Sequence, residues 1–264
     1  MLPRAPADGR EAEWTASWSV PAPEKVEIAQ RNVVGLLRAK AGGAHADEYI
    51  VISAHYDHIG VGRAVDGDMI YNGADDDATG TTAVLLLAEA LARQKAALPR
   101  NVLFVCFAGE ERGLRGSRAF CERPPVPLDR VVANLNIEMI GRPLPQNVGK
   151  AWITGESYSD FAEILREPLG RTGVELVPFE MAKMLFAASD NYSFVNKGVV
   201  AHSISAGSLH RDYHRPSDEV DKLDIPHMTR IIRALYDATV ELASRERAPA
   251  WSEAGKKVRE RMRR

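Results

Sequence analysis

Residues 49–60 read YIVISAHYDHIG, an apolar run that ends in a cluster of histidine, tyrosine and aspartate. The run Tyr49–Ala54 has the length of a strand and is rich in β-branched and aromatic residues. Its near-continuous hydrophobicity is typical of a strand buried on both faces of a parallel sheet. The polar residues His55 to His58 would therefore lie at the carboxyl end of a buried strand.

Other segments of the chain repeat this alternation of strand-length and helix-length patterns. The expected strands are Val33–Leu37, Tyr49–Ala54, Asn101–Ala108, Val131–Ile137, Ala151–Thr154 and Val199–Ser205. The expected helices are Thr79–Ala97, Ser159–Thr172, Asn191–Asn196 and Pro226–Arg245. Strands separated by helices predict an α/β fold, in which a largely parallel sheet is sandwiched between helices.

Carboxylates or imidazoles follow most of these strands. Glu110 and Glu111 follow Asn101–Ala108, Glu138 follows Val131–Ile137, and the last strand leads to a loop that carries His214. A further acidic run, Asp75 to Asp77, stands just before the first helix. Functional groups collect beyond the carboxyl ends of parallel strands, so we expect these side chains to meet at one edge of the sheet.

Several carboxylates gathered at one buried edge would repel one another unless a cation lies among them. Mixed histidine, aspartate and glutamate ligands suit zinc, with cobalt or manganese as substitutes. Taken singly, each residue has a structural reading: His55 as a hydrogen-bonding residue, Asp75 to Asp77 as a solvated turn, or Glu110 and Glu111 as a helix N-terminus. Their joint occurrence at strand ends favours a metal site.

Composition bounds the remaining possibilities. The net charge of −2 gives no general attraction to nucleic acid, and no apolar run is long enough for a transmembrane helix. The amino terminus lacks the basic and then apolar layout of a signal peptide. We expect a loose lead-in over residues 1–24, one catalytic domain over 25–245 and a basic tail over 246–264.

A disulfide between the two cysteines, Cys106 and Cys121, is possible but not established by the sequence.

Five motifs together resemble the bacterial-type di-zinc aminopeptidases, relatives of glutamate carboxypeptidase and the glutaminyl cyclases. They are AHYDHIG (54–60), GADDDATG (73–80), FAGEERGLRGS (107–117), NIEMIGR (136–142) and YHRPSDEVDKLD (213–224). The resemblance runs from Val33 to Leu242 and implies a mixed, mostly parallel central sheet of about eight strands.

The resemblance also implies a role for each site residue. Asp76 would bridge two Zn²⁺ ions, with one site completed by His55 and Glu138 and the other by Glu111 and His214. Asp57 would hydrogen-bond an imidazole and orient it. The Asp76–Asp77 peptide corresponds to a bond that is cis in several relatives. The position of Glu138 is more often aspartate in the family.

The activity that the resemblance implies is that of an exopeptidase, most simply an aminopeptidase acting on peptides. Glu110 would be the general base for a water molecule activated by two metals, and Tyr213 would hydrogen-bond the oxyanion. A carboxypeptidase or dipeptidase, a single-zinc glutaminyl cyclase and a receptor that has lost catalysis are the alternatives. The segments Phe179–Asp190 and Gly207–Asp212 are expected to line the substrate pocket, with Met181, Met184, Leu185 and Phe186 favouring an apolar side chain. The oligomeric state is left open, and relatives suggest an extracytoplasmic location.

Overall fold

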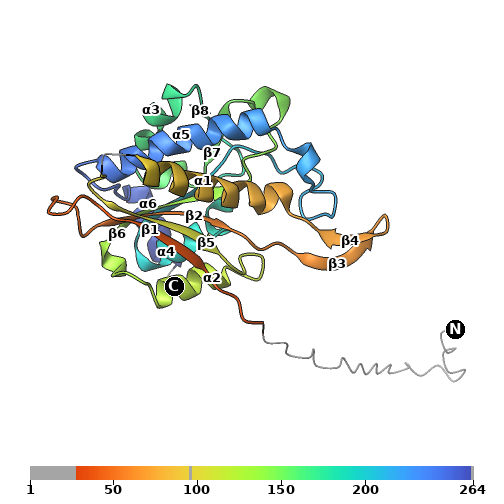
Figure 1. Ribbon diagram of the computed structural model, residues 1–264, viewed down its shortest axis with the longest axis horizontal. Helices are drawn as coiled ribbons and strands as arrows, with labels where there is room; N and C mark the ends of the chain where they lie inside the picture. Colours follow the sequence, from red (N-terminus) through yellow and green to blue (C-terminus); the bar gives the residue numbers. More distant parts are fainter. Residues whose placement is uncertain (1–27, 95–96, 263–264) are drawn as a thin grey trace, which may run out of the picture.

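A computed structural model of the chain describes residues 28–94 and 97–262. Its central sheet has seven strands in the order β1-β5-β2-β6-β9-β7-β8 (Figure 1). Their bounds are β1 Val33–Leu37, β2 Tyr49–His55, β5 Asn101–Phe107, β6 Val131–Glu138, β7 Lys150–Ile153, β8 Glu175–Leu176 and β9 Val200–Ser205. The four strands β5, β2, β6 and β9 are parallel, whereas β1 runs antiparallel to β5 and β7 antiparallel to β9.

Helices cover both faces of this sheet (Figure 1). Their bounds are α1 Gly80–Arg93, α2 Arg115–Glu122, α3 Phe161–Arg171, α4 Asn191–Lys197, α5 Ile225–Ser244 and α6 Glu253–Met262. One hydrophobic cluster joins α1, α3 and α5 to the sheet, and a second joins α2 and α4 to its other face. Strand β2 shows why the sheet needs a hydrophobic cluster on each face. Successive side chains point to opposite faces, so Ile50 and Ile52 belong to the first cluster and Val51 to the second.

The strand order creates a switch point at the centre of the sheet. From β2 the chain crosses to β5 on one side, and later returns to β6 and then β9 on the other side. Crossover connections on opposite sides leave a crevice outside the carboxyl ends of the strands, which is where α/β proteins bind ligands. His55 ends β2 and Glu138 ends the neighbouring strand β6, so both residues lie at this crevice.

The α/β class and the mostly parallel sheet are confirmed, with seven strands where about eight were expected. The first helix ends at Arg93, short of the expected Ala97. Two elements near the site were not predicted: the hairpin of β3 (Gly60–Val65) and β4 (Asp68–Tyr71), which projects from the body of the molecule in Figure 1, and α2. The lead-in expected over residues 1–24 lies outside the described residues.

Residues 246–262, expected as a basic tail, are attached to the domain through Trp251. Its indole Nε1 donates to the Gly198 carbonyl oxygen at 3.0 Å, and its ring packs against both hydrophobic clusters. Arg259 on α6 lies over the same ring, with its guanidinium carbon 5.4 Å from the centroid. This segment therefore packs against the domain.

Cys106 and Cys121 are both buried free thiols, so the possible disulfide is not formed. None of the helices within the described ranges is long and apolar enough to cross a membrane.

The structure also contains a π-helical segment η1 (Ala74–Thr79) and short 3₁₀ turns. The turns are Leu128–Arg130, Pro145–Asn147, Glu156–Tyr158, Met184–Ala187 and Val220–Lys222.

Candidate metal centre

His55 occupies the last position of β2 and is almost fully buried. Its Nδ1–H donates to the backbone oxygen of Asp57 at 3.0 Å, and its own carbonyl accepts from the hydroxyl of Thr81 at 2.7 Å. With Nδ1 acting as the donor, Nε2 keeps its lone pair and faces the crevice. A histidine oriented in this way is ready to bind a cation through Nε2.

Asp76 lies in η1, where its backbone departs from helical angles, with φ −109° and ψ 90°. The Asp76–Asp77 peptide bond is cis, as the resemblance implied. The segment is reached through Gly73 at φ 66°, a left-handed conformation that favours glycine. A Cβ on Gly73 would lie only 2.5 Å from the backbone oxygen of Asp76, so the segment folds back on itself at a position only glycine can occupy.

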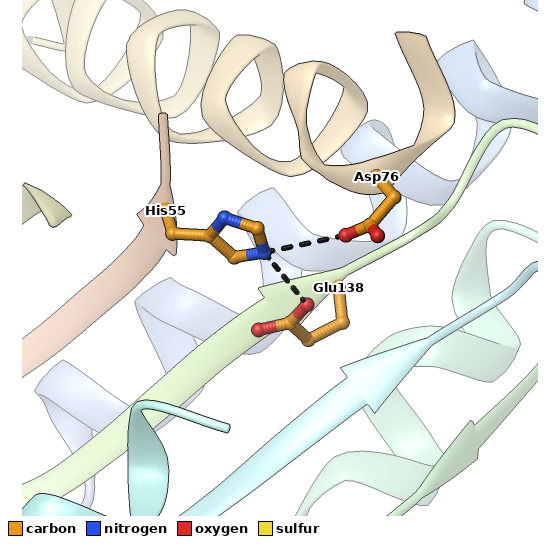
Figure 2. A group of neighbouring side chains, drawn as sticks. All are labelled: His55, Asp76 and Glu138. Atoms are coloured by element: carbon orange, nitrogen blue, oxygen red, sulfur yellow. Dashed lines mark ion pairs between the residues drawn. The ribbon is translucent and has the colours of Figure 1, made fainter. Parts of the chain in front are cut away.

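The two carboxylate oxygens of Asp76 face different groups of residues. Oδ1 lies 3.4 Å from Nε2 of His55, which in turn lies 3.5 Å from Oε2 of Glu138. Figure 2 shows these three side chains converging from β2, the start of the α1 region and β6. Oδ2 lies 3.2 Å from Nε2 of His214. One carboxylate therefore separates two clusters, each with its own imidazole.

Glu111 and His214 form the second cluster with Asp76. Nε2 of His214 lies 3.2 Å from Oε1 of Glu111, so both carboxylates point at the same ring nitrogen. His58 also lies here, with Nδ1 3.0 Å from the same Oε1. Oδ2 of Asp76 and Oε1 of Glu111 are buried and accept no hydrogen bond from the described residues. Buried oxygens without a donor, next to imidazole nitrogens, are what a divalent cation requires.

The longer side chain of Glu138 is held at one oxygen. Its Oε1 accepts from the side-chain amide of Asn136 at 2.7 Å and from the hydroxyl of Ser189. Its Oε2 is left facing His55 at 3.5 Å. Glutamate in place of the more common aspartate is therefore accommodated by fixing one oxygen and presenting the other.

Asp57 requires a correction. We expected its carboxylate to hydrogen-bond an imidazole, but its Oδ1 lies 3.8 Å from Nδ1 of His55, and it is the backbone oxygen of Asp57 that accepts the imidazole proton. The carboxylate instead accepts the backbone N–H groups of Glu110, at 3.0 Å, and Glu111, at 3.3 Å. Its place at the turn after β2 brings it beside the turn after β5, because these two strands are neighbours. Asp57 thus positions the two glutamates.

Another carboxylate holds the backbone of η1. Oδ2 of Asp218 accepts the N–H of Asp75 at 3.0 Å and the N–H of Asp76 at 3.1 Å. Asp75 is fully buried and accepts from the N–H of Gly141 at 2.7 Å, so it is part of the scaffold rather than of the crevice. The acidic run thus divides its roles: Asp76 faces the crevice and its neighbours hold the loop.

The ionisation of the cluster shows how strongly it demands positive charge. Burial favours a higher pKa for the Asp76 carboxyl, but the close imidazoles of His214 and His55 hold this pKa well below its usual value. Its contacts with the carboxylates of Asp76 and Glu111, each at 3.2 Å, raise the pKa of His214 to about 10. Burial opposes protonation of His55, yet the charge of Glu138 and the close carboxylate of Asp76 raise its pKa. These carboxylates therefore favour positive charge beside them, from protonated imidazoles or from a metal ion.

A pocket of about 90 Å³ opens onto the cluster and is large enough to hold water. The polar part of its wall includes His55, Asp76, Glu110, Glu111 and Glu138. Glu110 makes no contact with either histidine that is close enough to be an ion pair in the described structure. Burial first, and then the charge of Glu138, raise the pKa of the Glu110 carboxyl to about 9.

Another part of the pocket wall is mainly apolar. Trp152 stacks on Phe179 with the ring centroids 4.3 Å apart, and Leu185 and Leu209 complete this wall. Of the four residues proposed from the segment Phe179–Asp190, only Leu185 lines the pocket. Phe186 belongs to the core and Met184 is exposed, because a 3₁₀ turn directs their side chains elsewhere. Tyr213 lines the pocket and stacks on His214 with the centroids 3.9 Å apart.

Two residues of the site were missed by the sequence reasoning. Trp152 belongs to β7, which runs antiparallel to its central neighbour β9, so no argument from the carboxyl ends of the parallel strands could find it. His58 was quoted within the motif AHYDHIG but was given no role. A second histidine three residues after His55 was the available signal.

The fold and the site define an α/β protein with a carboxylate and imidazole centre, suited to divalent metal, at the switch point of its sheet. The sequence pattern of peptidase family M28 matches residues 32–239, and the chain belongs to this family.

Individual relatives agree with this membership. The chain is 29% identical over 212 residues to a leucine aminopeptidase of Ajellomyces capsulatus (strain H88), covering 74% of this chain and 52% of that enzyme. It therefore spans about half the length of this curated relative.

Solved structures share the fold. An aminopeptidase from Aneurinibacillus sp. strain AM-1 superimposes with a TM-score of 0.64 and 22% identity, over 82% of this chain and 49% of that one. The glutaminyl cyclase of Porphyromonas gingivalis superimposes with a TM-score of 0.61 and 17% identity, over 80% of this chain and 77% of that one.

Proposed function

We propose that this chain is the catalytic unit of a zinc aminopeptidase that removes N-terminal residues from peptides with two Zn²⁺ ions, for which cobalt or manganese can substitute. The observation that carries the proposal is the geometry of Asp76, whose two oxygens face two separate groups of candidate ligands. His55 and Glu138 complete one group, and Glu111 and His214 complete the other. The aminopeptidases among its M28 relatives support the same activity.

The residues present fit the ions. The first group offers one imidazole nitrogen and two carboxylate oxygens within 3.5 Å of that nitrogen. Buried carboxylate oxygens of Asp76 and Glu111 lack donors among the described residues, which is the state expected of ligands seen without their cation. Zinc bound at these positions supplies a Lewis acid and lowers the pKa of water toward neutrality.

Glu110 takes the proton from a water molecule in the pocket and passes it to the leaving amine. It lines the pocket next to Glu111, and its backbone is held by Asp57 at 3.0 Å. It shares no ion pair with His55 or His214 in the described structure, and bound cations would lower its raised pKa towards the range of a general base. Tyr213 lines the same pocket and would hydrogen-bond the oxyanion.

The lining of the pocket favours an aminopeptidase over a carboxypeptidase. Among the described residues that line it there is no lysine or arginine to bind a C-terminal carboxylate. The apolar side chains of Trp152, Leu185 and Leu209 suit an apolar first side chain of the substrate. Peptides that begin with leucine or a similar residue are the expected substrates.

A glutaminyl cyclase with a single zinc is the alternative that the shared fold allows. Two groups of candidate ligands, one with His55 and Glu138 and one with Glu111, favour two ions instead. Metal content per chain and the release of free amino acids distinguish the two activities.

Three measurements test the proposal. Aminoacyl and N-blocked chromogenic peptides are compared with and without a chelator, and only the free-amino substrates should be hydrolysed, in a chelator-sensitive way. Glu110→Gln should keep both metals and the fold but lose about 10²–10⁴ in rate, whereas the exposed Glu163→Gln on α3 is the matched control. Asp76→Ala should weaken both ions together. Hydrolysis of the blocked peptides alone, or near-normal turnover by Glu110→Gln, contradicts the proposal.

A further inference from the structure

His58 lies in the loop after β2, three residues beyond His55. Its side chain is only 7% exposed, and its Nδ1 lies 3.0 Å from Oε1 of Glu111 and 3.7 Å from Oδ2 of Asp76. Both of these oxygens are buried and accept no hydrogen bond from the described residues, and both nitrogens of His58 are likewise buried without a hydrogen-bond partner among them. The imidazole of His58 and these two carboxylate oxygens are thus buried side by side without hydrogen bonds. One cation bound between them would be a partner for all three groups.

The backbone nearby is shaped to hold this ring. Gly73 has φ 66°, and a Cβ there would lie 2.5 Å from Cγ and 2.8 Å from Cβ of His58. The same Cβ would lie 2.5 Å from the backbone oxygen of Asp76. The absence of a side chain at Gly73 thus allows the His58 ring to lie directly against the loop that presents Asp76.

His214 reaches the same two oxygens from a different part of the chain. Its Nε2 lies 3.2 Å from each, its ring meets that of His58 edge to face with centroids 5.6 Å apart, and its side chain is 37% exposed. The buried His58 and the partly exposed His214 therefore face the same candidate cation site, beside the oxygens of Asp76 and Glu111. The first position, in contrast, has the single imidazole of His55 and the carboxylates of Asp76 and Glu138.

We propose that His58 is a ligand of the second metal ion through Nδ1, in addition to His214; this inference rests on the two-ion function proposed above. With Asp76 and Glu111, the second position then has two oxygen and two nitrogen donors. Imidazole nitrogen suits zinc and cobalt, whereas carboxylate oxygen suits manganese and magnesium. The second position is therefore the tighter zinc site, it fills first, and loss of His214 alone does not empty it.

The test titrates metal-free protein with Zn²⁺ against a chelating indicator, and with Co²⁺ by its visible absorption. His58→Phe keeps a ring against Gly73 without the nitrogen, His58→Ala removes the ring, and His45→Ala is the control for loss of a histidine away from the centre. The wild-type protein should bind two ions. Both His58 variants should weaken the tighter ion about tenfold or more and change the cobalt spectrum. His214→Ala should keep two ions, and His58→Phe combined with His214→Ala should keep one.

Each outcome bears on the inference. If the wild-type protein and both His58 variants bind two ions with equal affinity and the same cobalt spectrum, His58 is not a ligand, although the two-ion function stands. If the wild-type protein binds one ion, both the function and this inference fail. If His58→Ala alone weakens binding while His58→Phe does not, the ring has only a packing role, and the inference is overturned.

Discussion

The carboxylate of Asp57 offers a quantitative test of how the centre is held together. Its side chain is 10% exposed and accepts two backbone N–H groups, from Glu110 at 3.0 Å and from Glu111 at 3.3 Å. Asp57→Ala leaves both donors without an acceptor. A buried donor without a partner costs about 1–3 kcal/mol, so two cost about 2–6 kcal/mol, with the longer bond favouring the lower half of that range. Asp57→Asn keeps one acceptor oxygen and should lose about half as much.

The assay is urea unfolding of the metal-free protein, which separates this effect from metal binding. Both variants remove the same negative charge from a cluster of carboxylates, so the difference between them isolates the hydrogen bonds. Asp68→Ala is the matched control, because Asp68 also accepts a backbone N–H, from Ile70 at 2.9 Å, but on the exposed hairpin where water replaces it. If Asp57→Ala costs no more than Asp68→Ala, or if the alanine and asparagine variants are equally stable, the reasoning is refuted.

Two further predictions concern parts of the fold away from the crevice. His202 on β9 is fully buried between the carbonyl oxygen of Thr154 and the hydroxyl of Ser159, each 2.7 Å from a ring nitrogen, and burial lowers its pKa from 6.5 to about 4. The imidazole of His202 binds a proton more readily in the unfolded chain than in the folded one. The free energy of unfolding is therefore at its full value above pH 6.5 and decreases as the pH falls towards 4. This decrease is about 3 kcal/mol, and the unfolding free energy of His202→Asn should lack that part of the pH dependence. Equal slopes of unfolding free energy against pH for the wild-type protein and the variant would contradict this prediction. Trp251→Ala should lower the free energy of unfolding by about 3 kcal/mol, as measured by urea unfolding followed by circular dichroism. This is the lower end of the range for removing a buried tryptophan side chain, because the ring is only partly buried. A cost below about 1 kcal/mol would show that residues 246–262 are not anchored by this ring.

The sequence by itself determined the class of the fold and the edge of the sheet at which the centre lies. Buried parallel strands have a local signature, as in Tyr49–Ala54, and their carboxyl ends must share one edge. Every residue that follows such a strand can therefore be assigned to the same edge of the sheet, even when the order of the strands is unknown. This is why His55, Glu111 and Glu138 were found together, and why Trp152, on an antiparallel strand, was not.

Only the tertiary structure decided which atom of each residue faces which partner. That Asp57 holds the Glu110 backbone, that the oxygens of Asp76 face two clusters, and that His58 points at Glu111 all depend on contacts between segments distant in the chain. Trp251 joins the fold for the same reason, because its partner Gly198 lies 53 residues earlier. Local periodicity encodes burial and direction, whereas the pairing of buried polar atoms follows from packing, which must satisfy each of them at once.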